Sequence, residues 1–216
     1  MNKFKGLRQA SHFGPTLIVT AIAFGFGTYY WWEGPAFVIA FTVATGQLVV
    51  GWSNDLYDYK DDLAHKRGNK PLVSGLITQQ YLTKWLRFMV PFSFIANLLG
   101  PLGIKGGLVY MFGIACGVAY NFYFKFSVLS PLPYAIAFAA LPSSVAISKD
   151  ITPPLWMLLG GAIFGMGAHF INVIKDMEQD QVSGIQGLPQ RLGSKKSIIV
   201  AITLIALGVL ALYLTM

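Results

Sequence analysis

The sequence predicts an all-α protein, a polytopic bundle of membrane-spanning helices. Its 216 residues are 55% apolar and only 12% charged, with a mean hydropathy of +0.57, whereas soluble domains carry about 25% charged residues. The apolar residues form long runs that approach the roughly 20 residues a helix needs to cross the hydrocarbon core of a bilayer. These runs do not alternate apolar and polar residues, as the strands of a membrane β-barrel do.

Seven spans are expected, at residues 14–32, 35–53, 81–100, 103–122, 131–148, 153–175 and 197–216. The first span follows a basic segment without a signal-peptide cleavage site, so it should be retained. Two polar stretches, residues 54–80 and 176–196, interrupt the spans and are too charged to lie in lipid. The last span runs to Met216 without a polar tail. We therefore expect residues 1–216 to form a single integral-membrane domain that lacks further C-terminal helices.

The distribution of positive charge predicts the orientation of the bundle. The net charge is +7, and with an inside N-terminus 14 of the 16 basic residues fall on one side, leaving only Lys105 and Lys149 on the other. By the positive-inside rule the first side faces the cytoplasm. Basic loops at the membrane surface account for the positive net charge, and no nucleic-acid partner is expected. The prediction is a multi-pass protein of the cell membrane.

Two segments about 120 residues apart, residues 54–62 and 172–180, share the pattern Asn-x3-Asp-x3-Asp and hold seven of the nine acidic residues. On a helix, a spacing of four places the amide and both carboxylates on one face. Close carboxylates repel one another unless a cation neutralises them, and Mg²⁺ prefers such oxygen ligands together with water and phosphate. The expected metal ligands are Asn54, Asp58, Asp62, Asp176 and Asp180. The alternative is a pair of solvated helix ends with ordinary surface acids.

Four spans separate the segments, so both should lie at the same membrane face, in two similar halves around a central cavity. The pattern predicts a two-sided clamp for Mg²⁺ and diphosphate, in which Asp58, Asp62, Asp176 and Asp180 carry the chemistry. Nearby bases should neutralise the remaining phosphate charge, although anchoring at the bilayer surface is the alternative for each. The expected substrate-binding residues are Asn54, Arg67, Lys70, Lys125, Tyr120, Asn172 and Arg191. For His169, hydrogen bonding between helices is favoured over metal binding.

These residues resemble a known family. The first segment, with the Arg67, Lys70-Pro71-Leu72 and Ser74-Gly75 that follow it, resembles the first signature of the UbiA superfamily of intramembrane polyprenyltransferases. The second segment, with Gly184-Ile185, Leu188-Pro189 and Gly193, resembles the second signature. Residues 120–125 and 130–142 look most like an actinobacterial branch of the superfamily. The sequence departs from the pattern at Lys70, where arginine is common, and in the five-residue spacing of Tyr120 and Lys125, which is commonly four.

The resemblance implies a bundle of nine spans, of which seven are present here. It also implies Mg²⁺-dependent transfer of a polyprenyl group from an isoprenyl diphosphate to an acceptor, usually aromatic, in the biosynthesis of quinones or related lipids. The donor, an aromatic or lipid acceptor and the bilayer are the implied partners, with the active site facing the cytoplasm.

Other functions remain open at this stage. Another reaction of the superfamily, such as terpene cyclisation or phosphoribosyl transfer to a lipid phosphate, would keep the acidic faces and change the acceptor pocket. A divalent-cation transporter would place its carboxylates in the middle of a span. A non-catalytic membrane protein is the third alternative, and metal-dependent release of diphosphate would separate the enzymes from the last two.

Overall fold

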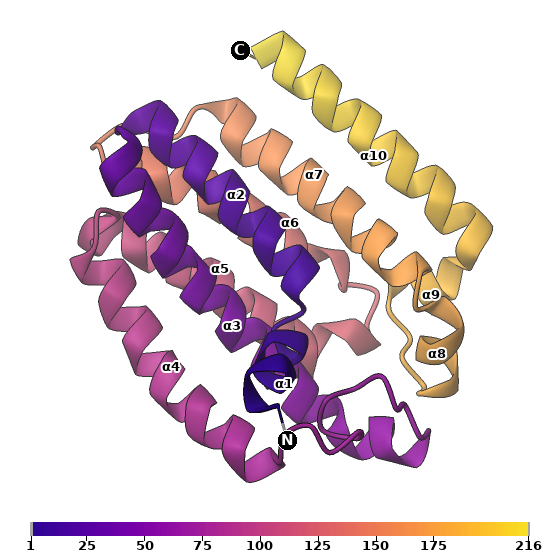
Figure 1. The fold of residues 1–216 in the computed structure, drawn as a ribbon. Coiled ribbons are helices and arrows are strands. Elements are labelled where there is room, and N and C mark those ends of the chain that lie inside the picture. The colour runs from indigo at the N-terminus through magenta and orange to yellow at the C-terminus, as the bar shows by residue number, and fades with distance from the viewer. Residues whose placement is uncertain (1, 216) are drawn as a thin grey trace.

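The computed structural model describes residues 2–215, which form ten α-helices and one short 3-10 helix, with no strand in that range. The all-α class is therefore confirmed. Figure 1 shows the long helices running alongside one another, with short helices gathered at one end. The elements are α1 (Lys3–Ala10), α2 (Phe13–Tyr30), α3 (Glu33–Ala64), α4 (Gln79–Leu99), α5 (Gly103–Phe122), η1 (Phe124–Phe126), α6 (Pro131–Ile147), α7 (Leu155–Ile174), α8 (Met177–Val182), α9 (Leu188–Leu192) and α10 (Ser194–Thr215).

The seven long helices coincide with the seven expected spans. By length and composition, α3, α5, α7 and α10 can each cross a membrane, and α1 with α2, bent by 68° where they join, make a fifth candidate. The remaining two are α4, whose first half carries Lys84 and Arg87, and α6, which has 17 residues. The main difference from expectation is that α3 continues to Ala64, so the first acidic segment is its C-terminal end.

Small residues bring neighbouring helices into close contact. A side chain at Gly161 of α7 would place its Cβ 2.8 Å from the Phe138 carbonyl oxygen of α6, and one at Gly27 of α2 would reach 2.8 Å from the Ala36 Cα of α3. Such positions let backbones approach within a membrane, where helix association depends on packing. The tightest helix contacts in the bundle therefore depend on glycine.

Buried polar side chains attach the neighbours of α3 to its backbone. The Asn97 amide of α4 donates to the Thr42 carbonyl at 3.0 Å, and the Tyr110 hydroxyl of α5 donates to the Val43 carbonyl at 2.7 Å. Nearer the acidic segment, Asn121 of α5 donates to the Val50 carbonyl at 3.1 Å. Because a buried polar group is costly unless it is paired, these bonds fix α4 and α5 against α3.

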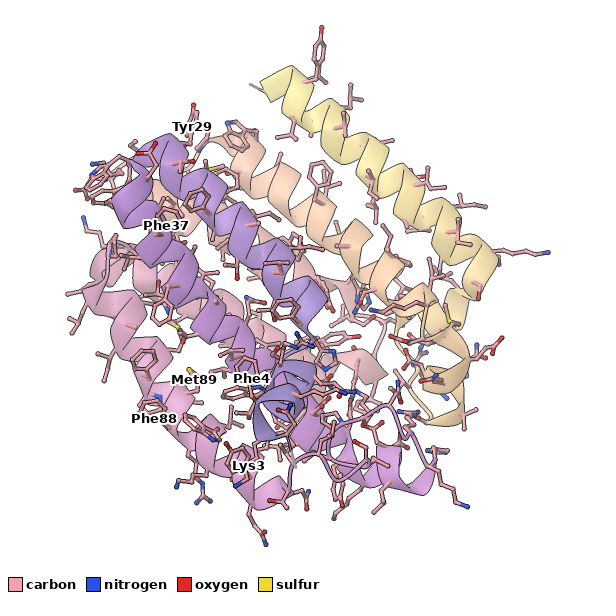
Figure 2. The ribbon with its side chains drawn as sticks, viewed as in Figure 1. Lys3, Phe4, Tyr29, Phe37, Phe88 and Met89 are labelled. Atoms are coloured by element: carbon pink, nitrogen blue, oxygen red, sulfur yellow. The ribbon has the colours of Figure 1, made fainter. Side chains whose placement is uncertain are left out.

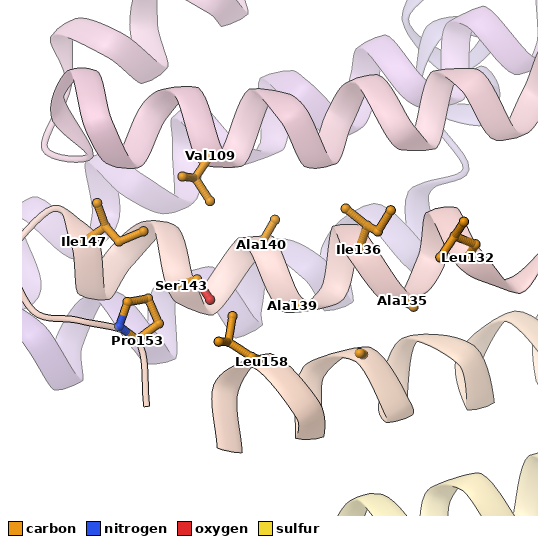
Figure 3. A pocket seen from close by; sticks show the side chains of 11 residues that line it. Val109, Leu132, Ala135, Ile136, Ala139, Ala140, Ser143, Ile147, Pro153 and Leu158 are labelled. Atoms are coloured by element: carbon orange, nitrogen blue, oxygen red, sulfur yellow. The ribbon is translucent and has the colours of Figure 1, made fainter. Parts of the chain in front are cut away.

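We call the end of the bundle that holds the C-terminal part of α3, the loop 65–78, α1, α8 and α9 the polar end (Figure 1). From there α10 returns along the outer side of α7, with which it makes most of its contacts. An apolar groove of about 450 Å³ lies along α6, between α5 and α7 (Figure 3). Its lining is apolar apart from the hydroxyl of Ser143, so it suits hydrocarbon better than water.

Candidate functional site

The first acidic segment has the geometry that its spacing predicts. Asn54, Asp58 and Asp62 lie on consecutive turns of α3, and the Asn54 amide donates to Asp58 Oδ2 at 2.6 Å. Asp62 is buried, while Asp58 is half-buried. The continuous helix thus presents the amide and two carboxylates on one face, as a site for a cation requires.

Two basic side chains pair with these carboxylates. Arg67 Nη1 lies 2.7 Å from Asp62 Oδ1, and the buried Lys125 of η1 forms an ion pair with Asp58. Burial raises the pKa of Asp62, against the opposing effects of Lys70 and Arg67. The negative charge of the first segment is therefore compensated within the protein. A cation that binds there has to compete with these basic side chains.

Lys70 contacts a carboxylate outside the predicted face. Its Nζ is 3.0 Å from Asp55 Oδ1 and 3.9 Å from Asp62 Oδ2, and His12 Nε2 lies 3.2 Å from the same Asp55 oxygen. Burial lowers the pKa of Lys70, but the nearby charges of Asp55 and Asp62 outweigh this and the net shift is upward. Lys70 therefore remains charged and serves as a bridge between Asp55 and the predicted face.

The second acidic segment is not one continuous helix, and the prediction of a single shared face is wrong there. Helix α7 ends at Ile174, Asp176 caps α8, and the Asp176 N–H bonds to the Val173 carbonyl three residues back. At this N-cap position the Asp176 side chain makes no capping hydrogen bond, so the break is seen in the backbone bonds. Asn172 and Asp180 consequently belong to different helices.

The residues of this second segment have separate partners. The Asn172 amide donates to the Tyr134 hydroxyl at 3.3 Å within the bundle. Asp176 is exposed, whereas Asp180 accepts a hydrogen bond of 2.8 Å from Gln190 of α9. Burial raises the pKa of Asp180 to about 6, and the charge of Asp176 acts in the same direction.

Arg67 links the two acidic segments directly. Besides its ion pair with Asp62, its Nη2 donates to the Gln179 carbonyl at 3.2 Å and to the Ser183 hydroxyl. That hydroxyl in turn donates to Asp61 Oδ2 at 2.7 Å. The structure thus places both segments at the polar end and ties α8 to the end of α3.

Tyr120 of α5 is within electrostatic range of carboxylates from both segments. Asp58, Asp176 and Asp180 all lie near enough to act electrostatically on its hydroxyl. Its ring makes edge-on contacts with Tyr134, at 5.2 Å between centroids, and with His169, at 5.4 Å. An aromatic wall therefore adjoins the acidic groups on the side of the bundle interior.

The chain is similar to several known proteins. The model of the UbiA prenyltransferase family matches residues 13–216. The chain belongs to the UbiA prenyltransferase family. A UbiA homologue from Archaeoglobus fulgidus, solved with DMAPP and Mg²⁺ bound, superposes with a TM-score of 0.78 at 18% identity, covering 100% of this chain and 77% of that one. A structure of digeranylgeranylglyceryl phosphate synthase gives 0.71 at 19% identity, covering 98% and 76%.

A curated relative is the digeranylgeranylglyceryl phosphate synthase of Archaeoglobus fulgidus, 25% identical over 158 residues, which are 68% of this chain and 51% of the relative. The chain thus spans about half the length of that curated relative. The expected membership of the UbiA superfamily is confirmed, and the structural matches show that the bundle has the UbiA fold.

The donor chemistry of this UbiA site fits a hard cation such as Mg²⁺, since the converging groups are carboxylate and amide oxygens. Within residues 2–215, however, no three acidic, histidine or cysteine side chains are close enough to form a ready metal cluster. Two of the predicted ligands are paired with basic side chains instead: Lys125 lies against Asp58 and Arg67 against Asp62.

The structure departs from the expectation for Arg191 and agrees with that for His169. Arg191 is exposed, and its Nε donates to the Gln186 carbonyl at 2.8 Å. Among residues 2–215 it forms no hydrogen bond or ion pair with either acidic segment. The buried His169 has its Nε2 3.0 Å from the Ser130 hydroxyl, which also accepts from the Leu188 N–H at 3.0 Å. His169 therefore joins helices by hydrogen bonding, as favoured over metal binding.

The sequence reasoning missed three partners of the charged groups. These are His12, Ser183 and Gln190, which lie outside the acidic pattern, and no local spacing marks them. Asp55 lies off the shared face, as its position beside Asn54 predicts, and it contacts Lys70 of the loop 65–78.

Proposed function

We propose that this chain transfers a prenyl group from an isoprenyl diphosphate to an acceptor, with Mg²⁺ as cofactor. The observation that carries the proposal is that Arg67 joins the two acidic segments at the polar end, where Lys70 and Lys125 also pair with carboxylates. UbiA homologues solved with DMAPP, GPP and Mg²⁺ bound support it.

The acidic residues hold the cation in this proposal. Asp58 and Asp62 on α3, with Asn54 beside them, would bind it from one side, and Asp176 and Asp180 from the other. Bound Mg²⁺ supplies positive charge against the diphosphate and stabilises the negative charge that grows as the carbon–oxygen bond breaks. The exposed position of Asp176 leaves it free to approach the diphosphate from outside.

The bases bind the leaving group directly. Lys125, Arg67 and Lys70 reach the carboxylates now, and each would exchange a carboxylate oxygen for a phosphate oxygen when donor and metal bind together. Charge-assisted hydrogen bonds of this kind contribute about 1.5–3 kcal/mol each. The rings of Tyr120 and Tyr134 border the site on the apolar side, where they exclude water and can stabilise a developing allylic cation through their π-faces.

An aromatic acceptor is the first candidate because the site is bordered by aromatic rings that can stack with one. A glycerol phosphate lipid is the second candidate, favoured by the similarity to digeranylgeranylglyceryl phosphate synthase. We further propose that the site faces the cytoplasm, as the distribution of basic residues indicates.

The proposal is tested in membranes with radiolabelled geranyl diphosphate and a panel of aromatic and glycerol phosphate acceptors. Product should form with Mg²⁺, disappear with chelator and return when Mg²⁺ is restored. Asp58→Ala and Asp176→Ala should each lower turnover by at least about 10²-fold, the scale of losing a main electrostatic stabiliser.

The matched control is Asp150→Ala, which removes an exposed carboxylate paired with Lys105 away from the acidic segments. It should keep full activity. Wild-type turnover in Asp176→Ala would refute the two-sided arrangement, and diphosphate release unaffected by chelator would refute the metal's role. Absence of any metal-dependent diphosphate release would favour a non-catalytic protein.

A further inference from the structure

Helix α1 is a fixed part of the fold. The Trp52 indole of α3 donates to the Leu7 carbonyl at 3.1 Å, and a side chain at Gly51 would come within 2.9 Å of the Ser11 carbonyl. Ala10 is fully buried. The 68° bend to α2 therefore holds α1 across the polar end instead of along the bundle.

A hollow of about 580 Å³ lies at this bend, lined by Lys5, Arg8, Gln9 and Phe13. Lys5 and Arg8 are three residues apart and so project from the same side of α1. Both are exposed, and among the described residues neither has a carboxylate within 4.0 Å, in contrast to the bases of the candidate active site. The hollow thus presents two cations with no protein counter-charge.

Aromatic side chains lie beside these cations. Phe4 is 78% exposed and Phe13 is 51% exposed, and the Arg8 guanidinium lies 5.7 Å from the centre of the Phe13 ring. Figure 2 labels Lys3 and Phe4 on α1 at the polar end. A helix that combines basic residues with exposed aromatic residues and lies across the ends of membrane helices is suited to the bilayer surface, where the cations meet anionic headgroups.

We propose that the hollow at the α1–α2 bend binds the phosphate headgroup of an anionic membrane lipid. Lys5 and Arg8 bind the phosphate, and Phe4 and Phe13 contact the upper part of the acyl chains. No residue of the acidic segments lines the hollow, although His12 beside Phe13 contacts Asp55 and the Gln9 amide donates to the Asn69 carbonyl in the loop that carries Lys70. The inference does not rest on the proposed function.

The test uses the full chain in neutral detergent, titrated with phosphatidylglycerol or with phosphatidylcholine of the same acyl chains, and counts retained lipid by native mass spectrometry. Phosphatidylglycerol should be retained in preference to phosphatidylcholine. The double substitution Lys5→Gln with Arg8→Gln should weaken that retention at least tenfold. The control, Lys195→Gln with Lys196→Gln, removes the same charge from exposed positions at the start of α10 and should leave retention unchanged.

Inorganic phosphate at millimolar concentration provides the second arm and should not displace the lipid. Displacement by phosphate alone would show that the hollow takes a soluble anion and would overturn the assignment to lipid. Equal loss in both double variants would overturn the site, since it would show a general effect of charge. If the double variant at α1 unfolds, Arg8→Gln alone is measured, and retention equal to wild type would likewise refute the proposal.

Discussion

Arg67 Nη1 lies 2.7 Å from Asp62 Oδ1, and Nη2 of the same guanidinium lies 3.2 Å from the Gln179 carbonyl oxygen. One planar group thereby joins the end of α3 to α8. Lysine keeps the charge but cannot make both bonds at once, because an ammonium lacks the rigid fork of a guanidinium.

Arg67→Lys should therefore loosen α8 without unfolding the bundle. We expect faster hydrogen exchange in residues 177–183 and a rise of about tenfold in the donor KM, the effect of losing one charge-assisted bond. The control is Arg87→Lys on the exposed side of α4. Unchanged exchange in residues 177–183 would show that Arg67 does not hold α8.

Substitution of Lys125 tests whether this residue binds diphosphate or anchors the chain at the membrane surface. It is buried against Asp58, and its Nζ lies 4.9 Å from the centre of the Tyr57 ring. Lys125→Met keeps the apolar stem and removes the charge, so donor affinity or turnover should fall tenfold or more. Acceptor affinity and membrane insertion should not change.

The same substitution gives a second result in the absence of donor. Asp58 loses its counter-charge, so the metal-free variant should unfold at a lower temperature than wild type, and Mg²⁺ should raise that temperature more than it does for wild type. Lys105→Met, which removes a 77% exposed partner of Asp150, is the control. It should change neither the unfolding temperature nor the effect of Mg²⁺ on it. Wild-type donor kinetics in Lys125→Met would make Lys125 an anchor and leave Arg67 and Lys70 as the bases that hold diphosphate.

The raised pKa of Asp180 predicts that metal binding depends on pH. Burial raises its pKa from 3.8 to about 6 in the metal-free protein, so below pH 6 the carboxyl is mostly protonated and cannot bind Mg²⁺. The apparent Mg²⁺ affinity, measured by thermal shift, should fall roughly tenfold for each unit of pH below 6. Asp62, whose pKa is also raised, acts in the same direction.

The effect of Asp180 on stability without metal has a defined sign. Because the folded state binds this proton more tightly than the unfolded state, its contribution to stability is present below pH 4 and is lost as pH rises through 6. Asp180→Asn should remove this component and flatten the Mg²⁺ profile between pH 5 and 7. A profile identical to that of wild type would show that another group governs it.

The orientation of the polar end can be measured by cysteine labelling. Cys116 is first replaced by serine, and single cysteines are then introduced by Lys66→Cys, Lys196→Cys or Lys105→Cys. A membrane-impermeant thiol reagent should reach the first two only from the cytoplasm and the third only from outside. External labelling at Lys66→Cys would reverse the orientation of the proposed site.

The predictable part of this fold is the part governed by local repetition. Runs of apolar residues located all seven long helices, and the spacing of four placed Asn54, Asp58 and Asp62 correctly because α3 is uninterrupted there. The same spacing failed at Asp176, because the chain leaves the helix between Ile174 and Met177 and a spacing of four carries no signal for such a break.

Contacts that depend on how a loop folds back could not be predicted, for a different reason. Lys70 lies near both Asp55 and Asp62, and its position depends on how the loop 65–78 packs against α1. Similarly, Gln190 reaches Asp180 only because α9 folds back beside α8. Regular spacing of residue types along the sequence predicts neither contact.

The break between α7 and α8 divides the proposed ligands into a rigid half and a movable half. Asp58 and Asp62 belong to a helix of 32 residues, whereas Asp180 belongs to one of six residues, too short to be stable by its own backbone bonds. Contacts from Arg67 and Gln190, together with the burial of Met177, hold it in place. Donor affinity should therefore depend on how well these contacts hold this short helix.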